Sequence, residues 1–228
     1  MSHTPHDLFE NRKQFQLERL ILFSDAVFAI AITLLVIEIR VPVVPQDGNT
    51  GKYLADALVL KIHEYFGFVL SFVVIGQFWT NHHKLFGYVN NYNGKLLWLN
   101  LHLLFWIVLV PFTSGLNSHY GNLSIVWQVY SINLFMISMS IYFLYRYIGN
   151  AKNHLSDLSL DALTRKYSLY RSMATSLIFL SGALIVLIPG DIAFWIARFI
   201  YLLIFLIITL INKRFRRAVK KQQHRHLA

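Results

Sequence analysis

The chain contains no cysteine and little charge. The absence of cysteine excludes disulfides, thiolate nucleophiles and cysteine-based metal sites. Only 14% of the 228 residues are charged, whereas a soluble domain carries about a quarter. Hydrophobic residues make up 56%, more than a soluble core of this size could absorb in such long runs, so the composition indicates an integral membrane protein. No cleavable signal peptide is expected, because residues 1–18 are polar and of mixed charge.

Six apolar stretches are each long enough to cross a bilayer as a helix, which takes about 20 residues. They predict an all-α membrane protein in which a turn at Pro189 and Gly190 pairs the last two helices as a hairpin. The predicted six-helix domain, 19–212, lies between an N-terminal segment, 1–18, and a basic tail, 213–228. The predicted spans are 19–41, 57–82, 94–116, 122–148, 167–189 and 191–212.

Lysine and arginine are concentrated on one side of the predicted topology. Most of them lie in the two terminal segments and in the loops after the second and fourth spans, whereas residues 114–123 contain none. The positive-inside rule therefore predicts that the N and C termini are both cytoplasmic. The basic tail is predicted to anchor the last span against anionic lipid rather than to bind nucleic acid. The sequence thus predicts a multi-pass protein of the cell (plasma) membrane.

The first predicted span carries an unbroken ladder of aliphatic residues behind a carboxylate. At about 100° per residue, Asp25 points nearly opposite to the ladder. A charge at this depth is costly unless it is paired, so Asp25 is expected to have a partner inside the protein. From periodicity alone, ordinary helix packing explains such a ladder more often than pore lining does. The ladder stripe holds Ile30, Leu34, Ile37 and Val41, with Thr33 beside it.

Polar side chains near the cytoplasmic ends of the second and third spans offer partners for Ser24 and Asp25. Trp79, His82 and His83 end the second span, and Asn100 and His102 lie in the third. We expect these residues to form one buried polar cluster. Adjacent histidines point about 100° apart on a helix, so His82 and His83 are interpreted as hydrogen-bonding residues, and no metal site is predicted.

Three motifs in this order resemble those of the transmembrane protein 175 family of potassium channels. "RLILFSDAVFAIAIT" resembles the R-x-x-x-F-S-D signature, with Arg19, Phe23, Ser24 and Asp25 at the signature positions. "GQFWTNHHKLF" and "NLHLLFWIVLVPF" resemble the second-helix and third-helix motifs. The resemblance covers roughly residues 19–116, and beyond them only the number of spans and the topology agree.

The resemblance implies a homotetramer in which the first helices line a central pore without a T-V-G-Y-G filter. It implies that Ile30 forms the constriction, with Leu34 and Ile37 as further layers and Thr33 as a neighbour that contributes to potassium preference. It also implies a polar network of the signature residues with Trp79 and a second-helix histidine, leaving open which of His82 and His83 takes part.

The predicted function is that of a potassium-permeable cation channel with a hydrophobic constriction, no cofactor and no catalytic residue. Its expected partners are potassium ions, the bilayer and three further copies of the chain, and Glu38 is expected near the outer mouth. The alternative is a six-span secondary cation transporter with His82, His83 and His102 as ligands. A transporter is expected to carry paired carboxylates within its spans, and apart from Asp25 the middle of every span lacks one. An enzyme ranks last, because no nucleophile or oxyanion site accompanies the polar residues.

Overall fold

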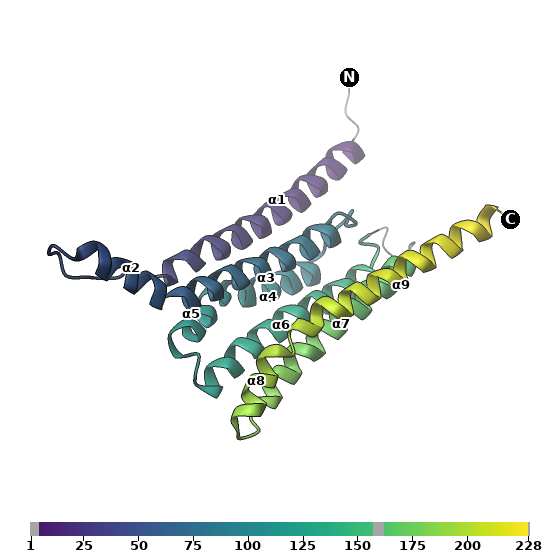
Figure 1. The fold of residues 1–228 in the computed structure, drawn as a ribbon. Coiled ribbons are helices and arrows are strands. Elements are labelled where there is room, and N and C mark those ends of the chain that lie inside the picture. Colours follow the sequence, from purple (N-terminus) through teal and green to yellow (C-terminus); the bar gives the residue numbers. More distant parts are fainter. Residues whose placement is uncertain (1–4, 157–161, 228) are drawn as a thin grey trace.

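The structure is a computed structural model and describes residues 5–156 and 162–227. The described part is built from helices that run side by side (Figure 1), and one isolated bridge, Val89 with Ser156, is its only β pairing. The helical elements are α1 (Pro5–Leu34), the 3₁₀ turn η1 (Leu35–Glu38), α2 (Thr50–Leu60), α3 (Ile62–Phe86), α4 (Gly94–Val108), α5 (Val110–Tyr120), α6 (Ser124–Ile148), the 3₁₀ turn η2 (Ala151–Asn153), α7 (Ala162–Ile185), α8 (Asp191–Phe199) and α9 (Leu202–Leu227).

The predicted all-α membrane fold is confirmed. Within the described residues, five stretches are long and apolar enough to cross a membrane. The bent pair α2 and α3 makes a sixth if both helices belong to one span. The five stretches are 12–38, 94–120, 124–148, 162–185 and 191–220.

The first span ends earlier than the sequence predicted. The helix finishes with η1 at Glu38, and Val41 lies beyond it with 85% of its surface exposed. The prediction that Val41 continues the Ile30 stripe is therefore wrong. A helical wheel assumes that the helix goes on, and it carries no information about where the helix stops.

An ion pair marks the break between α2 and α3. Lys61 lies between the two helices, and its Nζ is 2.8 and 3.0 Å from the carboxylate oxygens of Glu64. The two helices meet at an angle of 48°. None of the described residues of α2 is buried, and this helix projects away from the bundle (Figure 1). Helix α3 begins at Ile62, directly after Lys61, so the bend falls inside the predicted second span, 57–82.

Helix α6 lies in the middle of the bundle, between α4 and α5 on one side and α7 on the other. Helix α1 packs against α3 and α4 at one edge, and α9 packs against α7 at the opposite edge (Figure 1). The described N-terminal end of α1 and the C-terminal end of α9 point to the same end of the bundle (Figure 1). This arrangement agrees with an even number of crossings, while the cytoplasmic location of both ends stays a prediction.

Buried hydroxyl and amide groups join the helices to one another. Lipid tails are as apolar as leucine, so helices in a membrane gain stability from such bonds and from close packing rather than from the hydrophobic effect. Three of these bonds link Ser71 to Ser114 at 2.7 Å, Asn133 to Thr113 at 3.1 Å, and Tyr201 to Ser131 at 2.5 Å.

The last two spans form the predicted hairpin. Gly190 has φ of +122°, a conformation that favours glycine, and it turns the chain from α7 into α8. Arg198 is a cation inside the sixth predicted span, and the pattern of basic residues did not single it out. Its guanidinium donates a hydrogen bond to the carbonyl of Gly121 and lies 4.2 Å from the ring centroid of Phe194 and 5.3 Å from that of Trp127. These contacts compensate part of the charge, while the buried Nε of Arg198 has no hydrogen-bond partner in the described part of the chain.

Candidate functional site

Helix α1 has one face packed into the bundle and one face left free. The packed face repeats at intervals of three and four residues, which is the period of a helix that buries one stripe. At most 9% of each side chain on this face is exposed. Its members are Leu17, Leu20, Ser24, Phe28 and Ala31 of α1, followed by Leu35 of η1.

The four residues expected to line a pore all lie on the free face. Ile30 is 56% exposed, Leu34 37% and Ile37 68%, and Thr33 is also exposed. Leu34 leads into η1, where the chain makes about three residues per turn, so Ile37 lies nearly above Leu34. A single helix face encloses nothing, so a pore along these residues requires several copies of the chain around one axis.

Thr33 has its hydroxyl proton engaged within the helix. Its Oγ1 donates to the carbonyl oxygen of Ile30 at 2.9 Å. A hydroxyl has one proton and two lone pairs, so the Thr33 oxygen keeps its capacity to accept a hydrogen bond or to ligate a cation. The free face of α1 thus offers an oxygen ligand next to its aliphatic residues.

A chain of three hydrogen bonds connects α3, α4 and α1. His82 Nε2 lies 2.8 Å from Asn100 Oδ1, Asn100 Nδ2 donates to Ser24 Oγ at 2.8 Å, and Ser24 Oγ donates to the carbonyl of Leu20 at 2.8 Å. The hydroxyl of Ser24 donates its one proton to the Leu20 carbonyl, so towards Asn100 it can only accept. The amide nitrogen of Asn100 therefore faces Ser24, and its amide oxygen accepts a hydrogen bond from His82. His82 therefore carries a proton on Nε2. We call this set the Ser24–Asn100–His82 chain.

The structure distinguishes between the two histidines that the sequence left open. His82 is 1% exposed and lies between the rings of Phe28 and Phe86, with centroid distances of 5.4 and 4.2 Å. His83 is exposed, and its ring stacks on Trp79 at 5.4 Å. Neighbouring helical residues point in different directions, so only His82 can face Asn100.

Asp25 has a separate partner. Trp79 Nε1 donates to Asp25 Oδ1 at 2.9 Å, which links α1 to α3 at an exposed position. No hydrogen bond between described residues connects this pair to the Ser24–Asn100–His82 chain. The sequence predicted one polar cluster, whereas the structure contains two separate hydrogen-bonded groups. The Ser24–Asn100–His82 chain is buried, and the Asp25–Trp79 pair is more exposed.

The other residues predicted to belong to the polar cluster lie outside both hydrogen-bonded groups. Arg19 is exposed, and its guanidinium carbon is 6.0 Å from the ring centroid of Phe15. Phe23 is exposed at the edge of an apolar hollow of about 330 Å³ between α1 and α4. His102 accepts a hydrogen bond from Trp106 Nε1 at 3.2 Å. The three histidines required by the transporter alternative thus have three different neighbours and do not converge.

Glu38 packs against Gly115, a contact that no sequence motif indicates. Its carboxylate lies directly on the α-carbon of Gly115 in α5, so a Cβ atom at that position would overlap the carboxylate. Glu38 therefore lies between α1 and α5 rather than on the Ile30 face. A single glycine inside an apolar run gives no signal of such a contact, because the two residues are far apart in the sequence.

The same part of the chain matches known proteins. Residues 19–111 match the family model described as "Endosomal/lysosomal potassium channel TMEM175". A potassium channel of Chryseobacterium sp. (strain P1-3) is 34% identical over 157 residues, which is 68% of this chain and 76% of that protein. A potassium channel of Streptomyces collinus is 35% identical over 144 residues, which is 61% of this chain and 68% of that protein.

The fold also has a counterpart among solved structures. The crystal structure of a lysosomal potassium-selective channel TMEM175 homolog from Chamaesiphon minutus superimposes with a TM-score of 0.68. The match covers 88% of this chain and 98% of that chain, at 24% sequence identity. At this identity the likeness is one of fold.

The two adjacent histidines provide a matched test of the hydrogen-bond chain. We expect His82→Ala to lower the free energy of unfolding by about 2–4 kcal/mol, because it opens a cavity beside Phe28 and leaves Asn100 with an unpaired oxygen. His83→Ala removes an exposed ring and should cost less than about 1 kcal/mol. Unfolding of the purified protein in detergent measures both changes, and equal losses would contradict the assignment of His82.

The contact between Glu38 and Gly115 can be tested with a second glycine as the control. Gly115→Ala should destabilise the protein by about 1–3 kcal/mol through overpacking. Gly76→Ala should have little effect, because a Cβ atom there meets nothing within 4 Å. Adding Glu38→Ala to Gly115→Ala should recover most of the loss in a double-mutant cycle of unfolding free energies. Absence of this recovery would show that the two residues are not coupled.

Proposed function

The chain belongs to the TMEM175 family of potassium channels, and on this basis we propose that it forms a potassium-permeable pore lined by α1. Two relatives that align over more than two thirds of their own length are named as potassium channels. A channel of this kind is a multi-pass membrane protein and not an enzyme. We propose that it works in the cell membrane with both termini in the cytoplasm, as the distribution of basic residues favours.

The observation that carries the proposal is the free face of α1. Ile30, Leu34 and Ile37 stand exposed in successive layers, while the opposite face of the same helix is held in the bundle by the Ser24–Asn100–His82 chain. Long aliphatic side chains on a fixed helix face suit a ring built from several copies. We propose a homotetramer, in which four such faces surround the pore, in line with the family resemblance of the signature residues.

The proposed constriction is an Ile30 ring. Four isoleucine side chains give a bare cation no ligand, so a narrow ring loses its water and closes. Conduction then requires the ring to widen until a largely hydrated ion can pass. Potassium gives up or deforms its hydration shell more easily than sodium, so such a ring favours potassium moderately without carbonyl sites.

Thr33 and Glu38 are proposed to assist the passage of potassium at different heights along the pore. The Thr33 oxygen, with its proton donated to Ile30, can replace part of the hydration shell of a passing ion. Glu38 lies at the predicted outer end of α1, where its negative charge raises the local cation concentration, although its carboxylate rests against Gly115 rather than facing the Ile30 stripe.

The first test replaces the proposed constriction by a polar ring. Ile30→Asn should wet the ring, and we expect greater ion flux and weaker discrimination between potassium and sodium. Ion flux from protein-containing liposomes, measured with each cation in turn, gives both quantities. Leu177→Asn is the matched control, because Leu177 on α7 has the same exposed fraction, 56%, but lies on the far side of the bundle from α1.

Two outcomes would overturn this proposal. If Ile30→Asn behaves like the wild type, Ile30 is a packing residue and the constriction lies elsewhere. If the wild-type protein passes no electrogenic flux under any cation gradient, the chain is not a channel under the conditions of the assay, and the transporter alternative gains support.

The second test removes the oxygen of Thr33 without changing its shape. Thr33→Val should reduce the potassium-to-sodium permeability ratio, because the isosteric side chain has no lone pair for the ion. Thr33→Ser keeps the oxygen and should keep the ratio close to that of the wild type. Reversal potentials under bi-ionic conditions measure the ratio, and identical values for the two variants would exclude a role of the hydroxyl in selectivity.

A further inference from the structure

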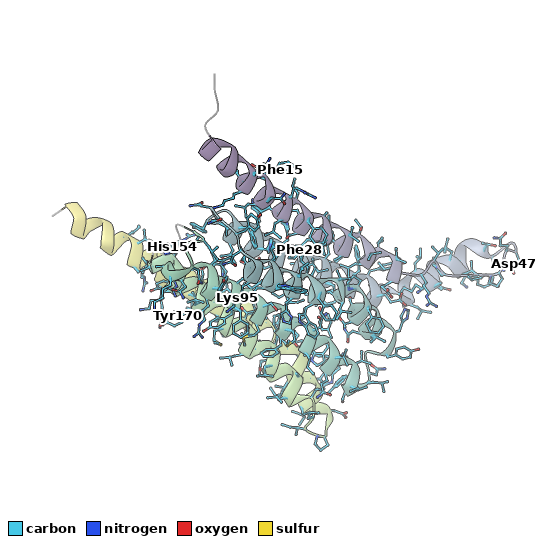
Figure 2. All side chains as sticks on the ribbon, turned by 180° about the vertical axis from the view of Figure 1, so that it is seen from behind. Phe15, Phe28, Asp47, Lys95, His154 and Tyr170 are labelled. Atoms are coloured by element: carbon cyan, nitrogen blue, oxygen red, sulfur yellow. The ribbon has the colours of Figure 1, made fainter. Side chains whose placement is uncertain are left out.

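A groove lies between α6 and α7, away from α1. Its volume is about 440 Å³, and it opens to the outside of the bundle. Figure 2 shows Tyr170 at the outer edge of the bundle, on the side away from Phe15 and Phe28 of α1. The groove therefore lies outside the site described above. It is lined by basic, aromatic and apolar side chains, among them Arg165, Lys166, Tyr142, Tyr170, Leu169 and Met173.

The two cations of the groove have no carboxylate partner among the described residues. The one ion pair between described residues is that of Lys61 with Glu64. The side chain of Arg165 passes over Gly149 at the end of α6, and its buried Nε has no hydrogen-bond partner in the described part of the chain. Lys166 Nζ lies 5.8 Å from the ring centroid of Tyr170. Two positive charges close together at one end of a candidate membrane span attract an external anion.

These charges lie near one end of a helix that is long and apolar enough to span a membrane. That helix, α7, begins at residue 162, so Arg165 and Lys166 lie within its first turns, where the lipid headgroups are expected. Leu169 and Met173 follow one and two turns deeper along the same wall. A charged rim above an apolar wall matches a molecule with an anionic head and a hydrocarbon tail.

A second row of basic residues lies beside the groove. Tyr167 of α7 packs against Phe215 of α9, with ring centroids 5.4 Å apart. This contact brings the basic segment 213–217 of α9 to the level of Arg165 and Lys166. Anionic lipid is attracted to such clusters of lysine and arginine near the membrane surface.

We propose that the groove between α6 and α7 binds the phosphate of an anionic phospholipid, with the acyl chains lying along Leu169 and Met173. Arg165 and Lys166 supply the positive charge and the N–H donors, and the hydroxyls of Tyr142 and Tyr170 can donate to the remaining phosphate oxygens. Free phosphate offers the same anionic chemistry but leaves the apolar wall uncovered. The proposal depends on membrane insertion and not on the proposed channel activity.

Native mass spectrometry of the purified full-length protein tests the proposal. Phosphatidylglycerol is compared with phosphatidylcholine of the same acyl chains, and we expect stronger retention of phosphatidylglycerol. Arg165→Gln combined with Lys166→Gln should weaken this retention by at least about tenfold. Arg12→Gln combined with Lys84→Gln removes the same net charge from exposed positions on α1 and α3 and should retain the lipid as the wild type does.

Two further measurements keep the test decisive. Lys166→Gln alone changes an exposed side chain, so it should fold normally and still weaken phosphatidylglycerol retention several-fold. Inorganic phosphate is added in competition with the lipid and should not displace it. Equal retention of the two lipids, equal loss in the control double variant, or displacement by inorganic phosphate would each overturn the proposal. Equal retention of the two lipids would mean that Arg165 and Lys166 are neutralised within the protein. Displacement by inorganic phosphate would mean that the groove binds free phosphate.

Discussion

A buried hydrogen bond between Asn100 and Ser24 holds α1 in one orientation about its own axis. The membrane core offers no water to satisfy polar side chains, so Ser24, Asn100 and His82 must bind one another. Ser24 lies on the same helix face as Phe28, and its bond to Asn100 holds that face against α4. The face that carries Ile30 is thereby turned outward. A buried hydrogen bond on one side of the helix thus decides which aliphatic residues are free on the other.

Helix α1 is held at both ends, by different means. Near the predicted inner end, Trp79 donates to Asp25, and near the other end the carboxylate of Glu38 rests on Gly115 while η1 tightens the helix. A helix fixed at two levels cannot rotate freely on its own. If the proposed ring of Ile30 side chains widens, α1 has to move together with α3, α4 and α5 or exchange these contacts for others.

The opposite edge of the bundle shows two ways of placing a cation in a membrane span. Arg198 donates to the Gly121 carbonyl and lies against the faces of neighbouring aromatic rings, although its buried Nε, like that of Arg165, has no hydrogen-bond partner among the described residues. Arg165 and Lys166 have no carboxylate partner among the described residues, and their groove is open to the surroundings. A charge at this depth needs a compensating group, and for Arg165 and Lys166 the proposal assigns that group to a lipid phosphate.

The all-α membrane fold and the shared face of Ile30, Leu34 and Ile37 could be predicted from the sequence, because span length and helical period follow from the order of apolar residues. The sequence also predicted that Asp25 needs a partner, since an unpaired charge is costly. It failed at Val41, because periodicity does not mark the end of a helix. The three-dimensional packing was needed to show that His82, and not His83, forms a hydrogen bond with Asn100. It was also needed to show that Glu38 rests on Gly115. These contacts join residues distant in the sequence, and their geometry depends on how α1, α3, α4 and α5 pack.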